Sequence, residues 1–210
     1  MKVSKWEYGG VYKKYDMNGL IRAGTGLVMV HNIFDPLPSF MKQADCIFCD
    51  PPCSRANINS FYTKADRTDH QTSYEPFAVR FFECIDEIAP NTVFLEVFAA
   101  NYDFFLAECK KRFEYVKVYS VTYYHKSECN CWIIQASNVS NATYPFNGMD
   151  EQEVIEYICE KTPYHCIGDL CMGRGLVGFY ANKNGRYFVG TELNKKRLAV
   201  LLERIAKGKI

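Results

Sequence analysis

An aspartate followed by two prolines stands directly after an apolar run, at Asp50, Pro51 and Pro52. Each proline fixes its backbone and removes an N–H donor, so the Pro51 carbonyl is left as an acceptor beside the Asp50 carboxylate. Two acceptors placed in this way can hold both hydrogens of one amino group. Such a grip favours the tetrahedral geometry from which the nitrogen lone pair attacks an electrophilic methyl group. The pattern therefore predicts chemistry at an amine.

A second pattern, G-x-G-x-x-G, begins at Gly173 and follows a strand-like run. Glycines at such a turn let a ligand approach the backbone, and the first turn of the next helix offers unpaired N–H groups. Glu192 ends the next strand-like run, about twenty residues further on, where a carboxylate can accept from both hydroxyls of a ribose. The spacing predicts a nucleoside site. A tight structural turn with a solvated glutamate is the alternative.

The same glycine pattern occurs in NAD-binding proteins. There the loop normally opens the first strand–helix unit, and further units follow it. Here only residues 193–210 come after Glu192, so the other strands of the sheet have to come from the N-terminal side. This order argues against an ordinary dehydrogenase, and an NAD-dependent oxidoreductase is kept as a less favoured alternative.

Short β-rich runs alternate with helical patterns along the chain, which predicts an α/β fold. The strand-like runs are residues 26–31, 45–49, 92–98, 115–123, 129–136, 164–168 and 186–190. The helical patterns are residues 36–43, 74–88, 101–113, 150–161, 175–183 and 194–206. We expect seven strands in a mainly parallel sheet with helices on both faces, and one antiparallel edge hairpin from the fifth and sixth of these runs. Asp50 and the Gly173 loop then meet beyond the carboxyl ends of the strands.

Three further segments have clear local signals. Asp150 reads as a helix N-cap, because Glu153 stands three residues later in front of apolar positions. Residues 52–73 and 137–148 are polar and rich in turn formers, and they are longer than typical connections. We expect both to be irregular substrate loops.

Together these patterns resemble the S-adenosylmethionine (SAM)-dependent amino-group methyltransferases, in the permuted order that places D-P-P-Y before the glycine loop. Residues 28–52 look like the segment entering the catalytic loop, and residues 167–205 look like the cofactor half. The resemblance implies one Rossmann-like methyltransferase domain over residues 1–210, with a basic and aromatic segment at 1–25 and no separate target-recognition domain. Members methylate adenine N6 or cytosine N4, usually in DNA, and first take the base out of the stack. The aspartate-first form is more typical of the adenine enzymes.

The resemblance also implies roles for individual residues. The catalytic segment would be Asp50, Pro51, Pro52 and Cys53. The cofactor SAM would be held by Asn32, Asp50, Asp169, Leu170, Cys171, Gly173, Gly175, Glu192 and Leu193, with Glu192 on the ribose. The substrate contacts would come from Arg55, Tyr62, Lys64, Tyr123 and Tyr124.

Cys53 departs from the family pattern, because members carry an aromatic residue there that stacks on the extruded base. A thiol offers no such face, so Tyr62, Phe61 or the Tyr123–Tyr124 pair would have to replace it. The alternative is that these aromatic residues are simply core. A catalytically silent domain that binds the cofactor and acts as a partner or regulator is therefore the second hypothesis of function.

The composition limits which binding partners and which cellular compartment we expect. With 25 Lys+Arg against 24 Asp+Glu, the formal charge is +1, so nucleic acid must be attracted by local patches. DNA is favoured over RNA, and a homodimer or a partner subunit is possible. The chain shows no run of roughly 20 apolar residues and no signal-peptide pattern, so we expect a cytoplasmic protein without membrane contact. Cys46 and Cys49 would point to opposite faces of a strand, which disfavours a metal site.

Overall fold

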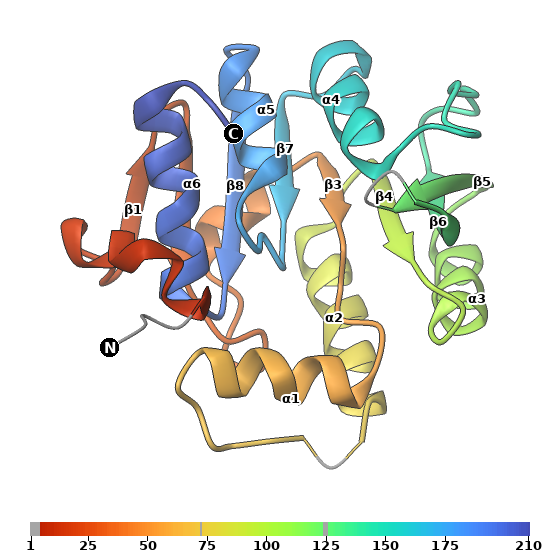
Figure 1. The fold of residues 1–210 in the computed structure, drawn as a ribbon. Coiled ribbons are helices and arrows are strands. Elements are labelled where there is room, and N and C mark those ends of the chain that lie inside the picture. The colour runs from red at the N-terminus through yellow and green to blue at the C-terminus, as the bar shows by residue number, and fades with distance from the viewer. Residues whose placement is uncertain (1–4, 72, 124–125) are drawn as a thin grey trace.

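The chain forms one twisted sheet with helices on both sides (Figure 1). The computed structural model describes residues 5–71, 73–123 and 126–210. The sheet order is β1-β2-β8-β7-β3-β4-β6-β5. The strands are β1 (Leu20–Ala23), β2 (Gly26–Val30), β3 (Cys46–Cys49), β4 (Thr92–Val97), β5 (Tyr115–Tyr123), β6 (Lys126–Ser137), β7 (Cys166–Asp169) and β8 (Tyr187–Glu192).

The sheet is parallel in its centre and antiparallel at both edges. Strands β2, β8, β7, β3 and β4 pair in parallel, whereas β1 pairs with β2, and β6 with both β4 and β5, in antiparallel fashion. An antiparallel hairpin, β5–β6, lies at one edge, but it is formed by the fourth and fifth of the expected runs rather than the fifth and sixth, because a helix over residues 151–161 separates β6 from β7. The expectation of seven strands and one hairpin was wrong, because the eight-stranded sheet has a second hairpin, β1–β2, at the other edge.

Helices α1 (Arg55–Lys64), α2 (Glu75–Ile88) and α3 (Tyr102–Arg112) pack on one face of the sheet. Helices α4 (Glu151–Lys161), α5 (Leu176–Lys183) and α6 (Lys195–Lys207) pack on the other. Two 3₁₀ segments, η1 (Lys5–Lys14) and η2 (Ser39–Gln43), complete the chain. Alternation along the strands divides the core into two clusters, and Cys46 and Cys49 fall in different ones, as expected from a period of two.

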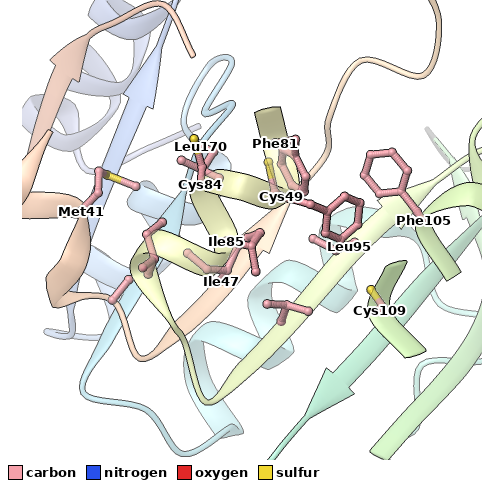
Figure 2. Packing of buried hydrophobic residues seen from close by; sticks show 14 of the residues in the cluster. Met41, Ile47, Cys49, Phe81, Cys84, Ile85, Leu95, Phe105, Cys109 and Leu170 are labelled. Carbon is pink, nitrogen blue, oxygen red and sulfur yellow. The ribbon is translucent and has the colours of Figure 1, made fainter. Parts of the chain in front are cut away.

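The cluster under α2 is rich in aromatic side chains. Phe81 and Phe105 approach each other with ring centroids 5.5 Å apart, and they lie against Leu95 of the sheet (Figure 2). All three side chains are fully buried. Helix α2 places its apolar side on β3 and β4, and so fixes β3, whose end carries Asp50, against its neighbour β4.

Helix boundaries follow the local sequence in one case and depart from it in another. Helix α4 begins with the expected capping box, in which Glu153 accepts from the Asp150 backbone N–H at 2.8 Å. The expectation that residues 52–73 are irregular was wrong for its first half, because α1 forms there with Ser54 as N-cap. This helix buries only Ile58 and Tyr62, so its apolar signal in the sequence is weak.

The chain order creates a crevice between β7 and β3. From β3 the chain continues to β4 on one side, and from β7 it continues to β8 on the other. Ligands of open α/β sheets bind at such a switch point, beyond the carboxyl ends of the strands. In Figure 1, α1 runs across this end of the sheet. Within the described residues, no helix is both long and apolar enough to cross a bilayer.

Candidate active site

A cavity of about 410 Å³ opens at the carboxyl ends of the parallel strands. The two sequence patterns line this one cavity: Asp50 and Pro51 follow β3, and Gly173 follows β7. Most predicted site residues line it. They are Asn32, Asp50, Pro51, Pro52, Cys53, Tyr62, Tyr123, Asp169, Leu170, Cys171, Gly173, Glu192 and Leu193.

Three predicted site residues do not line the cavity, and a fourth lies outside the described residues. Gly175 is not among the lining residues, and it adopts a left-handed φ of 74° where a Cβ atom would come within 2.6 Å of Leu201. Its role is therefore to let α5 pack against α6. Arg55 and Lys64 lie on α1 away from the lining. Tyr124 lies outside the described residues.

The Asp50 segment is held rigidly at its end. The Tyr74 hydroxyl donates to the Pro52 carbonyl at 2.8 Å, and the Cys53 thiol donates to Asn57 Oδ1 at 2.7 Å. Within the described part of the chain, no donor reaches the Pro51 carbonyl. This oxygen and the Asp50 carboxylate therefore keep their acceptor capacity for a ligand in the cavity.

The carboxyl groups of Asp50 and Asp169 both have pKa values near 7. The Asp50 carboxyl is open to the cavity but surrounded by protein, and this desolvation raises its pKa to about 7 against the opposing effect of Arg197. Burial likewise raises the pKa of Asp169 to about 7, although its Oδ1 accepts from the Cys171 N–H at 2.9 Å. Each carboxyl would be stabilised as an anion by a bound cation.

Glu192 braces the glycine loop. Its Oε2 accepts from the Gly173 N–H at 2.6 Å and its Oε1 from the Asn194 N–H at 2.9 Å. Each carboxylate oxygen still has a lone pair for a ligand hydroxyl. Gly173 has φ 56°, a left-handed backbone conformation that favours glycine at this position.

Aromatic side chains line the cavity from two directions. Phe98, directly after β4, meets Tyr123 of β5 edge to face with ring centroids 5.1 Å apart. From α1, Phe61 carries the Arg197 guanidinium 4.8 Å from its ring centroid, and the Tyr62 hydroxyl donates to Asn32 Oδ1 at 2.9 Å. Phe98 and Tyr123 line the same cavity as Asp50, so an aromatic ring is available there to a bound base.

Several residues that line the cavity are not indicated by the sequence patterns. His31 looks like a scattered histidine in the sequence, and Arg197 looks like part of a solvated basic helix face, yet both line the cavity. Glu96 is hidden inside an apolar run and is buried. A charged residue at a strand position that should face the core is the signal that could have found Glu96.

The basic and aromatic N-terminal segment packs on the molecule itself. The Lys64 ammonium lies 4.1 Å from the ring centroid of Trp6. Lys196, which is only 7% exposed, pairs with Glu7 at 2.7 Å and with Asp66 at 2.9 Å. These contacts tie η1 to α1 and α6, beside the cavity. Contact of this segment with nucleic acid stays a prediction.

Comparison with known proteins finds similarity in structure alone. No family model matches the sequence, and no curated protein matches it. Among solved structures, M1.HpyAVI is similar with a TM-score of 0.58 at 14% identity, over 85% of this chain and 97% of that one. The proposed DNA modification methylase TTHA0409 from Thermus thermophilus, in complex with SAM, gives a TM-score of 0.56 at 14% identity, over 79% and 86%.

A third solved structure has a more specific description. The PvuII DNA methyltransferase, cytosine-N4-specific, gives a TM-score of 0.54 at 7% identity, over 89% of this chain and 94% of that one. The chain shares its fold with these three solved structures. At these identities the likeness concerns the fold, and the site has to be argued from this chain's own residues.

Proposed function

We propose that this chain is a SAM-dependent methyltransferase that acts on an exocyclic amino group of a nucleic-acid base. Adenine N6 in DNA is our first choice, with cytosine N4 or adenine in RNA as alternatives. The observation that carries the proposal is the single cavity that joins Asp50 and Pro51 to the Gly173 loop. The permuted chain order belongs to the same proposal, because the Asp50 segment precedes the glycine loop.

The lining fits SAM in size and in charge. A volume of about 410 Å³ lies in the range of small-molecule sites. Glu192 would accept from the ribose hydroxyls, and Asp169 would face the positively charged methionine part. When bound, SAM supplies an electrophilic methyl group on a cationic sulfur. Two solved structures with this fold, those of M1.HpyAVI and TTHA0409, were determined with SAM.

Asp50 and Pro51 then hold and orient the substrate. The Pro51 carbonyl and the Asp50 carboxylate accept the two amino hydrogens, which turns the nitrogen lone pair toward the cofactor side of the cavity. Asp50 has a pKa of about 7, so it can also take up the proton that the amine loses after transfer. DNA is the favoured polymer because TTHA0409 and the PvuII enzyme are described as acting on DNA.

Thermal stabilisation by SAM, S-adenosylhomocysteine and NAD distinguishes the candidate functions. We expect SAM and S-adenosylhomocysteine, at about 100 times their Kd, to raise the melting temperature by roughly 5–10 °C, whereas NAD leaves it unchanged. Stabilisation by NAD without a response to S-adenosylhomocysteine would instead identify an oxidoreductase. Stabilisation by SAM without methylation of any DNA or RNA would identify the silent cofactor-binding domain.

The pH dependence of SAM binding tests the raised pKa of Asp169. Asp169, with a pKa of about 7, is mostly protonated at pH 6, and its carboxyl group can pair with a cation only after losing that proton. We expect SAM affinity to increase about tenfold from pH 6 to pH 8, with proton release measured by calorimetry in buffers of different ionisation enthalpy. S-adenosylhomocysteine, which lacks the sulfonium charge, should change less. Equal pH dependence for both ligands would contradict this account.

The aromatic pair near Asp50 is our candidate for the stacking surface that Cys53 lacks. Truncation of Tyr123 to Ala is expected to lower kcat/KM for the nucleic acid by about 10- to 100-fold, because stacking of one base is worth about 1–3 kcal/mol. Tyr123→Phe keeps the ring and should keep most activity, and SAM affinity should not change in either variant. Full activity of Tyr123→Ala in single-turnover assays would remove this residue from the substrate site.

A further inference from the structure

Glu96 is a buried acid with an unsatisfied oxygen beside the proposed catalytic segment. Its side chain is 1% exposed, and it contributes to the lining of the cavity. The Oε1 atom has no hydrogen-bond partner within the described part of the chain. A buried polar atom without a partner costs free energy, so an acid retained at such a place calls for an explanation.

Strand register brings Glu96 next to Asp50. Cys49 of β3 pairs with Leu95 of β4 in parallel, so the next residues, Asp50 and Glu96, follow at the same end of neighbouring strands. Two residues earlier, Phe48 and Phe94 lie in the same core cluster, so the alternation of side chains places Asp50 and Glu96 toward the same face. Neighbouring strands lie about 5 Å apart, which allows both carboxyl groups to reach one small ligand.

The surroundings of Glu96 favour its protonated form. The charged groups that face it are acidic: Asp50 after β3, and Asp150 and Glu151 at the start of α4. From β6, the Cys131 thiol donates to its carboxyl group. Burial and then these negative charges raise the pKa of Glu96 well above its ordinary value. These surroundings favour the neutral carboxylic acid, whose O–H can donate a hydrogen bond.

We propose that Glu96 is a specificity residue, whose O–H donates to the ring nitrogen adjacent to the amino group that Asp50 and Pro51 hold. The inference rests on the proposed function and extends it to the substrate's hydrogen-bonding pattern. Adenine and cytosine both present an amino group beside an unprotonated ring nitrogen, N1 or N3, whereas the corresponding position N1 of guanine carries a hydrogen. Acceptors at Asp50 and a donor at Glu96 together match the first pattern.

Analogues that lack the ring nitrogen test this role. Duplexes that carry 1-deazaadenine or 3-deazacytosine, according to the base that wild type methylates, keep the amino group and replace the acceptor by C–H. We expect wild type to lose about 10- to 100-fold in kcat/KM on the analogue, because a site built to donate a hydrogen bond rejects a ligand that cannot accept it. Glu156→Gln, a change at an exposed glutamate that pairs with Lys183, should behave as wild type.

Two substitutions at Glu96 distinguish the effect of its hydrogen-bond donor from the effect of its side-chain size. Glu96→Leu should lower activity on the ordinary base to that on the analogue, while the melting temperature rises because the orphan acid is gone. Glu96→Gln keeps an N–H donor, so it should keep discrimination, and it should abolish any decline in activity at alkaline pH that wild type shows through Glu96 ionisation.

The outcomes distinguish this inference from the proposed function. Equal rates of wild type on the ordinary base and the analogue overturn the inference and leave the proposed function standing, because methyl transfer is then observed. Persistent discrimination in Glu96→Leu also overturns it. If wild type transfers no methyl group to any DNA or RNA, the proposed function fails, and the inference fails with it.

Discussion

Replacing Asp50 by Ala is expected to abolish base methylation, by roughly 10³-fold or more, while SAM still raises the melting temperature as it does in wild type. The side chain supplies one of two acceptors for the substrate amine and lies beside the glycine loop in the same cavity. Its loss removes the orientation of the nitrogen lone pair, but it leaves Glu192 and the Gly173 loop intact. Single-turnover methylation and thermal shift, measured on the same preparation, separate the two effects.

Two further variants calibrate that result. Asp50→Asn keeps one acceptor oxygen and should retain more activity than Asp50→Ala. Asp103→Ala removes an exposed carboxylate from α3, far along the chain from the catalytic segment, and should behave as wild type. If Asp50→Ala methylated DNA or RNA at the wild-type rate, the amine-holding role of this residue would be refuted.

Substitution of Glu192 by Gln is expected to weaken S-adenosylhomocysteine binding by about 100-fold. The carboxylate accepts from the Gly173 and Asn194 N–H groups and, in our account, from the ribose hydroxyls. An amide nitrogen cannot accept, so a backbone N–H of the loop loses its partner and one ribose contact is lost as well. Calorimetric titration measures the change in affinity, and thermal unfolding reports the accompanying loss of stability.

A ligand analogue distinguishes two roles of Glu192, bracing the glycine loop and binding the ribose. The 2′-deoxy form of S-adenosylhomocysteine lacks one hydroxyl, so wild type should bind it more weakly, and Glu192→Gln should distinguish it less from the parent compound. Glu160→Gln, on the exposed surface of α4, is the matched control. An unchanged preference for the parent compound in Glu192→Gln would mean that this glutamate serves only to brace the loop.

The parts of the fold that follow local rules could be predicted from sequence. The central strands are apolar runs, and the Asp150–Glu153 capping box fixes the start of α4, so both were found. Strand β1 was missed because it spans four residues and buries only Ala23 fully. Helix α1 was missed because it buries two side chains and its remaining surface is polar. In these elements, tertiary packing rather than pattern decides the structure.

The candidate site divides in a similar way. Asp50 and Gly173 carry recognisable motifs, and the rule that ligands bind beyond parallel strand ends predicts their meeting. Glu96 lies within an apolar run, and only the register of β3 with β4 reveals that it stands beside Asp50. Arg197 belongs to a basic helix, and its position over Phe61 depends on how α6 packs near α1. Such contacts between distant segments leave no mark in a single sequence.

Nucleoside mass spectrometry after incubation of mixed DNA and RNA with methyl-labelled SAM tests the central claim most directly. We expect labelled N6-methyladenine or N4-methylcytosine with wild type and none with Asp50→Ala. Label on a ring carbon, such as C5 of cytosine, or no label in any nucleoside while SAM is bound, would contradict it.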